Sequence, residues 1–160
     1  MIEGMDNATR RALIDRYAAG PAEVRAALEG ATPEELDARP DDGGWTAREI
    51  AHHLADSETT STIRLRRLLA EDDPVIVGYD QDEFARVLHY DRPIARSLAV
   101  LDAVRASNVE LLELLTDADL ARAGTHSEDG PYSVALWLEL YAAHAHDHAD
   151  QIRRARTFAV

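Results

Sequence analysis

Residues 144–154 read HAHDHADQIRR and place three histidines on alternate positions. Imidazole nitrogens bind divalent metals and exchange protons near neutral pH, so this spacing could support either chemistry. In a helix of 3.6 residues per turn, His144 and His148 lie about 40° apart on one face, whereas His146 lies roughly 160° from both. His144 and His148 can therefore hold one ion from a single helix, and His146 cannot join them.

A second predicted helix carries another histidine on its inward face. This helix begins at Thr46, whose side chain can cap it, with Glu49 at the spacing of a capping box. Its inward face reads Ile50, His53, Leu54, Ser57, Ser61, Leu65 and Leu68. The helix with His144 and His148 is expected to run from the Ser133 cap to about Arg156. Its inward face reads Val134, Trp137, Leu138, Tyr141, His144, His148, Ile152 and Ala155.

His53, His144 and His148 thus occupy positions that a bundle normally fills with apolar side chains. Burying one polar group without a partner costs roughly 1–3 kcal/mol, so three imidazoles together need partners. One divalent ion satisfies all three and leaves coordination positions for water or substrate, as in a catalytic site. Imidazole suits Zn, Ni, Fe and Cu alike. The alternative is a purely structural bundle, in which Ser57, Ser61 and backbone groups hydrogen-bond the rings.

Two familiar metal motifs do not match this segment. The HExxH motif of zinc proteases needs Glu directly after its first histidine, where this chain has Ala145. The HxHxDH motif of metallo-β-lactamase-like hydrolases is one residue longer than HAHDH and lies on a loop. The metal hypothesis therefore depends on helix geometry.

The elements that position these histidines indicate an all-α protein with one domain over residues 1–160. Apolar spacing predicts two further long helices, over 8–30 and 92–116, and Gly20-Pro21 predicts a kink or a break in the first. Residues 74–90 are expected to form a loop with a short helix and no strand pair. Residues 116–133 are expected to form a loop. Four long amphipathic helices favour an antiparallel four-helix bundle.

Composition excludes several function classes. The net charge of −13 disfavours a nucleic-acid partner, and no apolar run is long enough to span a membrane. All 17 basic residues are Arg and there is no cysteine, so the chain offers neither a lysine base nor a thiolate nucleophile. The first 17 residues lack the pattern of a secretory signal, which favours a cytoplasmic location.

The residues singled out above resemble the DinB/YfiT-like superfamily of metal-binding four-helix bundles. The segment GGWTAREIAHHLADSE is similar to the family pattern W-S-x-x-E-x-x-x-H-L-x-D-x-E, and HAHDHADQI is similar to its terminal H-x-x-x-H-x-x-Q. YDQDEFA, at residues 79–85, resembles a third family segment. The resemblance covers residues 13–156. It implies a metal triad of His53, His144 and His148, Zn or Ni as the ion, and a homodimer.

The resemblance also implies an activity, either that of a metal-dependent hydrolase or that of an S-transferase using a low-molecular-weight thiol. In a hydrolase, metal-bound water attacks a small-molecule substrate. In a transferase, the thiol takes that position as a thiolate and must come from a cosubstrate, because the chain has no cysteine. A non-catalytic, stress-related module that binds metal or a small ligand is the alternative from another class.

Catalytic residues beyond the triad are weakly indicated. Asp56 could reach the edge of the site as a general base, and Tyr141 could orient substrate or pack in the core. Gln151 lies one turn after His148 and could hydrogen-bond its ring. Arg64 and Arg67 could meet an anionic substrate or pair with carboxylates. His52 and His146 are expected to be exposed neighbours of the triad, and the sequence assigns no role to His89 or His126.

Overall fold

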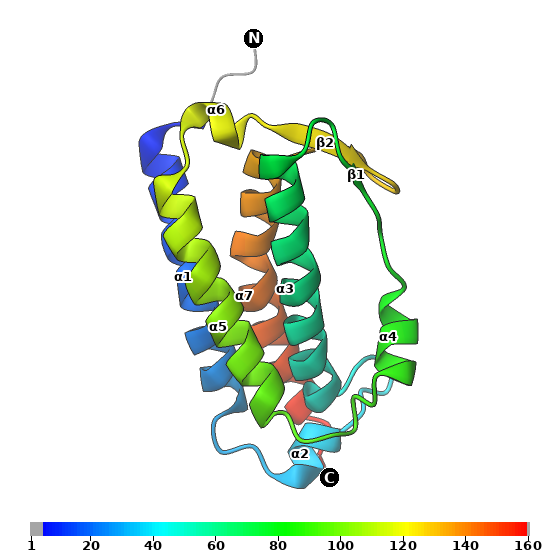
Figure 1. Ribbon diagram of the computed structural model, residues 1–160. Helices are drawn as coiled ribbons and strands as arrows, with labels where there is room; N and C mark the ends of the chain where they lie inside the picture. Colours follow the sequence, from blue (N-terminus) through cyan, green and yellow to red (C-terminus); the bar gives the residue numbers. More distant parts are fainter. Residues whose placement is uncertain (1–4, 160) are drawn as a thin grey trace.

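Four long helices dominate the computed structural model, which describes residues 5–159. They are α1 (Asn7–Leu28), α3 (Ala47–Ala70), α5 (Ala95–Leu114) and α7 (Val134–Arg156), and they form one bundle (Figure 1). Three short helices connect them: α2 (Pro33–Asp37), α4 (Gln81–Val87) and α6 (Asp117–Leu120). No helix in the described range is long and apolar enough to cross a membrane.

Helices α3 and α5 run in the same direction. His52, near the start of α3, hydrogen-bonds Ser97 near the start of α5, and Thr62 further along α3 hydrogen-bonds Asn108 further along α5. The segment between them, residues 71–94, therefore crosses back along the length of the bundle, and Figure 1 shows it descending beside α3. This crossover carries α4.

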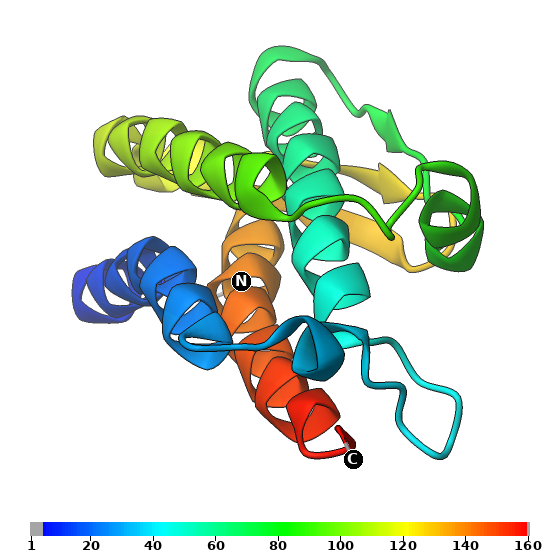
Figure 2. The ribbon, with the colours of Figure 1, turned by 90° about the horizontal axis from the view of Figure 1, so that it is seen from below.

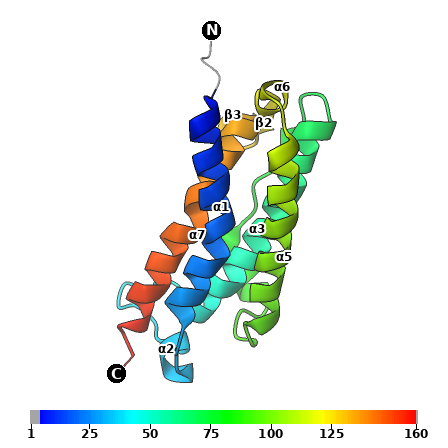
Figure 3. The same ribbon diagram turned by 90° about the vertical axis from the view of Figure 1, so that its left-hand side faces the viewer.

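Helices α1 and α7 are also parallel to each other, and they lie side by side in Figure 3. His146 hydrogen-bonds the carbonyl of Arg16, and Arg156, further along α7, hydrogen-bonds the carbonyl of Ala27, further along α1. The expectation of a simple antiparallel bundle is therefore corrected: two parallel pairs run in opposite directions. The reason is the 71–94 crossover, which is long enough to return the chain before α5 begins.

A small sheet replaces the loops expected on either side of α5. Its strands are β1 (Val75–Ile76), β2 (Ala123–His126) and β3 (Gly130–Ser133). Strand β1 pairs in parallel with β2, and β2 forms an antiparallel hairpin with β3. Residues 74–90 contain the expected short helix, α4, and no strand pair of their own, but β1 pairs with β2, about fifty residues later. The loop expected over residues 116–133 was wrong, because this segment forms α6 and the β2–β3 hairpin. Figure 2 shows this sheet and α4 on one side of the bundle.

The helix ends follow the local sequence. Thr46 accepts a hydrogen bond from the Glu49 backbone while the Glu49 carboxylate accepts one from Thr46, which completes the expected capping box. Ser133 caps α7 by accepting from the backbone N–H of Leu136. These caps fix where α3 and α7 begin, and so fix which of their residues face inward.

Helix α1 continues through Gly20 and Pro21, so the break that was one of the two predicted outcomes does not occur. Proline has no N–H, so the carbonyl of Tyr17, four residues earlier, loses its helical partner. The Arg105 guanidinium of α5 donates to that carbonyl at 2.6 Å. Glycine at position 20 makes this possible, because a Cβ there would overlap the guanidinium and would lie 2.8 Å from the Cβ of Ala145.

A buried polar layer separates two apolar parts of the core. The Glu58 carboxylate accepts from Arg105 and, at 2.8 Å, from the hydroxyl of Tyr17. Both charged side chains are at most 1% exposed. Asn108 donates to the Tyr17 hydroxyl at 2.9 Å. This layer joins α1, α3 and α5, and Arg105 extends it to α7 through the carbonyl of Tyr141.

Candidate metal centre and adjoining cavity

Three histidine rings from two helices meet inside the bundle. His53 of α3 lies with its ring centroid 5.5 Å from that of His144 and 4.8 Å from that of His148, and the last two are 4.5 Å apart. Each ring offers one nitrogen, and these three nitrogens lie within 4.8 Å of one another. The convergence of two helix faces that the histidine spacing predicted is thus present in the fold.

Gln151 sets the orientation of one ring. Its side-chain carbonyl oxygen accepts from Nδ1 of His148 at 2.7 Å, which leaves Nε2 of that ring with a free electron pair. Nε2 of His148 lies 3.2 Å from Nε2 of His144. Two imidazole nitrogens on one tetrahedral zinc ion would be about 3.4 Å apart, given Zn–N bonds of about 2.0–2.1 Å. The spacing of these two nitrogens fits a shared ion.

Burial keeps all three rings neutral. It lowers the pKa of His53 to about 3, with the charge of His148 as a second cause. Burial also places the pKa of His144 well below its usual value, and His148 and His53 lower it further. Burial also lowers the pKa of His148, and the hydrogen bond to Gln151 opposes this shift. Neutral imidazole is the form that coordinates metal, so these residues fit a divalent ion.

Trp45 covers one side of the cluster. Its indole ring lies 4.7 Å from the His53 ring, and its Nε1 donates to Asp82 of α4 at 3.2 Å. The tryptophan that precedes α3 therefore links the histidine cluster to the crossover helix. This contact restricts the His53 ring.

His52 is buried, which corrects the expectation of an exposed neighbour. Its Nε2 donates to the carbonyl of Arg92 at 2.9 Å, and its Nδ1 accepts from Ser97 at 2.7 Å. Its ring also lies 5.4 Å from the Tyr90 ring. One nitrogen is bonded to α5 and the other to the crossover just before it, so His52 is not available to an ion at His53. The sequence placed this ring on the flank correctly but did not reveal that α5 covers the flank.

The other three histidines lie apart from the cluster. His146 is half-buried and donates to the carbonyl of Arg16 at 2.9 Å, so it too is not a fully exposed residue. His89 is exposed and has a positive φ of 54°. His126, at the end of β2, is buried beside the Asp129 carboxylate at 3.1 Å. His126 lines the cavity described below, a role the sequence did not indicate.

The two acidic residues that follow His53 are already engaged. Asp56 accepts from the Tyr90 hydroxyl at 2.7 Å, and Glu58 belongs to the buried layer with Arg105. Tyr141 packs against Trp137, with ring centroids 5.1 Å apart, and it also lines the cavity.

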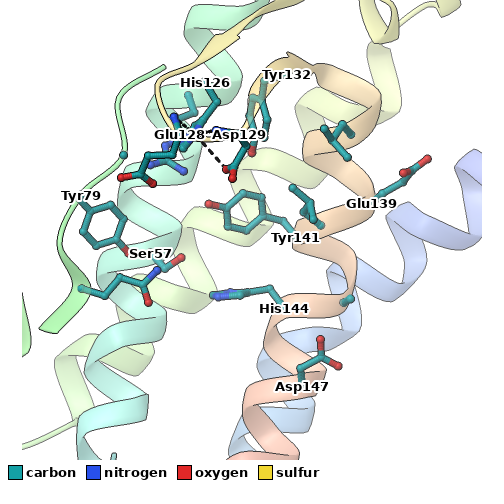
Figure 4. A pocket seen from close by; sticks show the side chains of 16 residues that line it. Ser57, Tyr79, His126, Glu128, Asp129, Tyr132, Glu139, Tyr141, His144 and Asp147 are labelled. Atoms are coloured by element: carbon teal, nitrogen blue, oxygen red, sulfur yellow. Dashed lines mark hydrogen bonds and ion pairs between the residues drawn. The ribbon is translucent and has the colours of Figure 1, made fainter. Parts of the chain in front are cut away.

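A cavity of about 510 Å³ adjoins the cluster through His144. Its walls come from α3, α7, the β2–β3 hairpin and the segment before α4. Figure 4 shows Ser57 and Tyr79 facing Tyr141 across it, with His144 below Tyr141. The lining residues that the sequence did not group with the triad include Tyr79, His126, Glu128, Asp129 and Tyr132. Only the crossover and the hairpin bring these residues to the cluster.

The fold and the cluster define a four-helix bundle with three converging histidines beside a cavity. The sequence pattern of the DinB superfamily matches residues 16–152. The chain therefore belongs to the DinB superfamily, as its motifs suggested.

Named relatives agree with this assignment. A protein of Oceanobacillus iheyensis called "Putative metal-dependent hydrolase OB0782" is 38% identical over 119 residues, which are 74% of this chain and 69% of that protein. A protein of Bacillus mycoides, also called a putative metal-dependent hydrolase, is 33% identical over 136 residues. These residues are 85% of this chain and 79% of that protein.

A solved structure is similar over almost the whole fold. It is YfiT from Bacillus subtilis, described as a probable metal-dependent hydrolase with an unusual four-helix bundle topology. The TM-score is 0.90 at 30% sequence identity, and the match covers 97% of this chain and 90% of YfiT.

Proposed function

We propose that this protein is a metal-dependent hydrolase of a small-molecule substrate, with His53, His144 and His148 as ligands of one divalent ion, Zn or Ni. The observation that carries the proposal is the position of His144, which belongs to the cluster and also lines the cavity. The names of the relatives support the same activity. A divalent ion held by three histidines supplies Lewis acidity and activates water at neutral pH.

The side chains around the ion have separate tasks in this proposal. Gln151 holds the His148 ring, and Trp45 restricts the His53 ring. Burial raises the pKa of Tyr141, so its hydroxyl stays protonated at neutral pH and can donate to a substrate oxygen. Asp56 is a weak candidate for a general base, because one of its carboxylate oxygens already accepts a hydrogen bond from Tyr90.

Transfer of a low-molecular-weight thiol is the second activity that these ligands permit. The chain has no cysteine, so the sulfur would have to come from a cosubstrate. The names of the relatives favour the hydrolase. The homodimer and the cytoplasmic location remain predictions from the sequence.

The test compares the two activities in one preparation. Protein loaded with Zn or Ni is incubated with 4-nitrophenyl acetate, and separately with monochlorobimane plus cysteine or glutathione. We expect ester hydrolysis at least about tenfold above that of the metal-free protein, and loss of the excess in His144→Ala. Thiol-dependent turnover without hydrolysis would select the transferase. A metal-saturated protein inert in both assays would support the non-catalytic binding module.

A further inference from the structure

The cavity beside the histidines contains buried polar atoms without partners. Four side-chain polar atoms in the described range are buried with no hydrogen bond, and three of them belong to residues that line this cavity. They are Nε of Arg64, the hydroxyl of Tyr79 and Nδ1 of His144. Buried polar groups are normally hydrogen-bonded, so these three residues beside one cavity have hydrogen-bonding capacity that the fold leaves unused.

Arg64 is the only Arg among the cavity residues, and the chain has no Lys. One of its terminal nitrogens, Nη2, donates to the carbonyl of Val77 at 3.0 Å, which holds the guanidinium in place. No carboxylate within the described residues lies within salt-bridge distance of it. By contrast Arg67, one turn later on α3, pairs with Glu71 at 2.8 Å. Of the two arginines that the sequence offered to an anion, only Arg64 is unpaired and faces the cavity.

Three tyrosines, Tyr79, Tyr132 and Tyr141, line the cavity together with this guanidinium. Burial raises the pKa of Tyr132 and of Tyr141, so both hydroxyls stay protonated at neutral pH. The Arg64 guanidinium also lies 5.8 Å from the centre of the Tyr79 ring. Neutral tyrosine hydroxyls and a guanidinium are all hydrogen-bond donors. This end of the cavity is built to receive an acceptor with negative charge.

The opposite charge lies at the rim. Four exposed acidic residues also line the cavity: Glu128, Asp129, Glu139 and Asp147. They repel a ligand that carries two or more negative charges, such as a phosphate monoester. A carboxylate carries one charge, which one guanidinium neutralises with charge-assisted hydrogen bonds.

We propose that Arg64, with the hydroxyls of Tyr79, Tyr132 and Tyr141, binds a carboxylate group of the substrate. The inference rests on the proposed hydrolase function, because it takes the same cavity as the substrate site. The substrate is then a small carboxylic acid whose reacting group lies toward His144. Arg64 is a binding residue and takes no part in bond breaking.

Calorimetric titration with three matched probes tests this assignment. Phenylacetate carries the carboxylate, phenylacetamide is its neutral counterpart, and phenyl phosphate carries more charge. We expect phenylacetate to bind the metal-loaded protein at least about tenfold more tightly than either of the others. Phenyl phosphate binding more tightly than phenylacetate would overturn the proposal.

Variants of α3 assign the binding to Arg64. Arg64→Gln should weaken phenylacetate binding about tenfold or more, while the matched control Arg67→Gln should bind as the wild type does. Arg64→Lys, which keeps the charge but loses the planar donor pair, should fall between them. Circular dichroism and metal content verify that each variant is folded and loaded. If folded, metal-loaded Arg64→Gln bound phenylacetate as tightly as the wild type, the proposal would be wrong.

Metal removal separates this proposal from the proposed function. In His148→Ala, phenylacetate binding that still depends on Arg64 supports the carboxylate site, whether or not the wild type binds metal. Binding that disappears in His148→Ala but persists in Arg64→Gln would show that the ion holds the probe. That result would refute the role of Arg64 and leave the metal centre intact.

Discussion

Arg105 donates to the carbonyl oxygen of Tyr17, the acceptor that Pro21 leaves without a helical partner. The same guanidinium holds Glu58, and both charges are almost fully buried. One side chain of α5 thus compensates for a proline in α1 and neutralises a carboxylate of α3. A buried ion pair contributes little net stability when both partners are present, but a lone buried charge is costly.

Removal of Arg105 should therefore destabilise the fold strongly. We expect Arg105→Ala to lower the free energy of unfolding by about 3–5 kcal/mol, because Glu58 and the Tyr17 carbonyl both lose their partner. Urea unfolding followed by circular dichroism measures the change. The matched control is Arg25→Ala, which breaks an exposed pair with Asp102 and should cost no more than about 1 kcal/mol. Equal effects of the two variants would contradict the account of the buried layer.

Gln151 should tune metal affinity without being a ligand. It fixes the His148 ring through Nδ1, and loss of such a partner typically costs about 10–100-fold in metal affinity. Gln151→Ala should show this loss in competition titrations with a chromogenic chelator. Asp150→Ala is the control, since Asp150 is exposed and pairs with Arg153. A Gln151→Ala protein with wild-type affinity would exclude the proposed orienting role.

The metal-free protein should lose stability in mild acid. The pKa of His53 in the folded protein is about 3, against 6.5 for a free histidine, so the unfolded chain binds the extra proton between these values. The free energy of unfolding should then fall as pH drops below about 6.5, by about 1.4 kcal/mol per pH unit for each such histidine. Urea unfolding at several pH values measures the slope. His53→Gln should show a shallower slope than the wild type, and an unchanged slope would refute the buried neutral ring.

The inward faces of α3 and α7 could be read from the sequence because helical spacing is local. The caps Thr46 and Ser133 and the direction of His53, His144 and His148 follow from residues within a few turns. The parallel pairing of α3 with α5 could not be read from the sequence, since it depends on the path of the long crossover between them. The pairing of β1 with β2 could not be predicted either, because both strands are short and they are far apart in the sequence.

Buried polar residues were the hardest to interpret. Glu58 follows His53 by five residues on α3, but its partner Arg105 is 47 residues away on another helix. Gly20-Pro21 predicted an interruption of α1 because Arg105, whose guanidinium replaces the lost hydrogen bond to Tyr17, lies on another helix. The sequence offered both Arg64 and Arg67 to an anionic substrate, and it could not show that Glu71 pairs with Arg67 and that Arg64 lines the cavity.

Metal analysis of untagged protein tests the central claim most directly. Inductively coupled plasma mass spectrometry should find about one divalent ion per chain in the wild type, and none in His53→Ala or in His148→Ala. His146→Ala is the matched control on the same helix, because His146 faces Arg16 of α1, and it should keep the ion. A wild-type protein that binds no divalent ion, or a His53→Ala protein that binds one as well as the control does, would contradict the account.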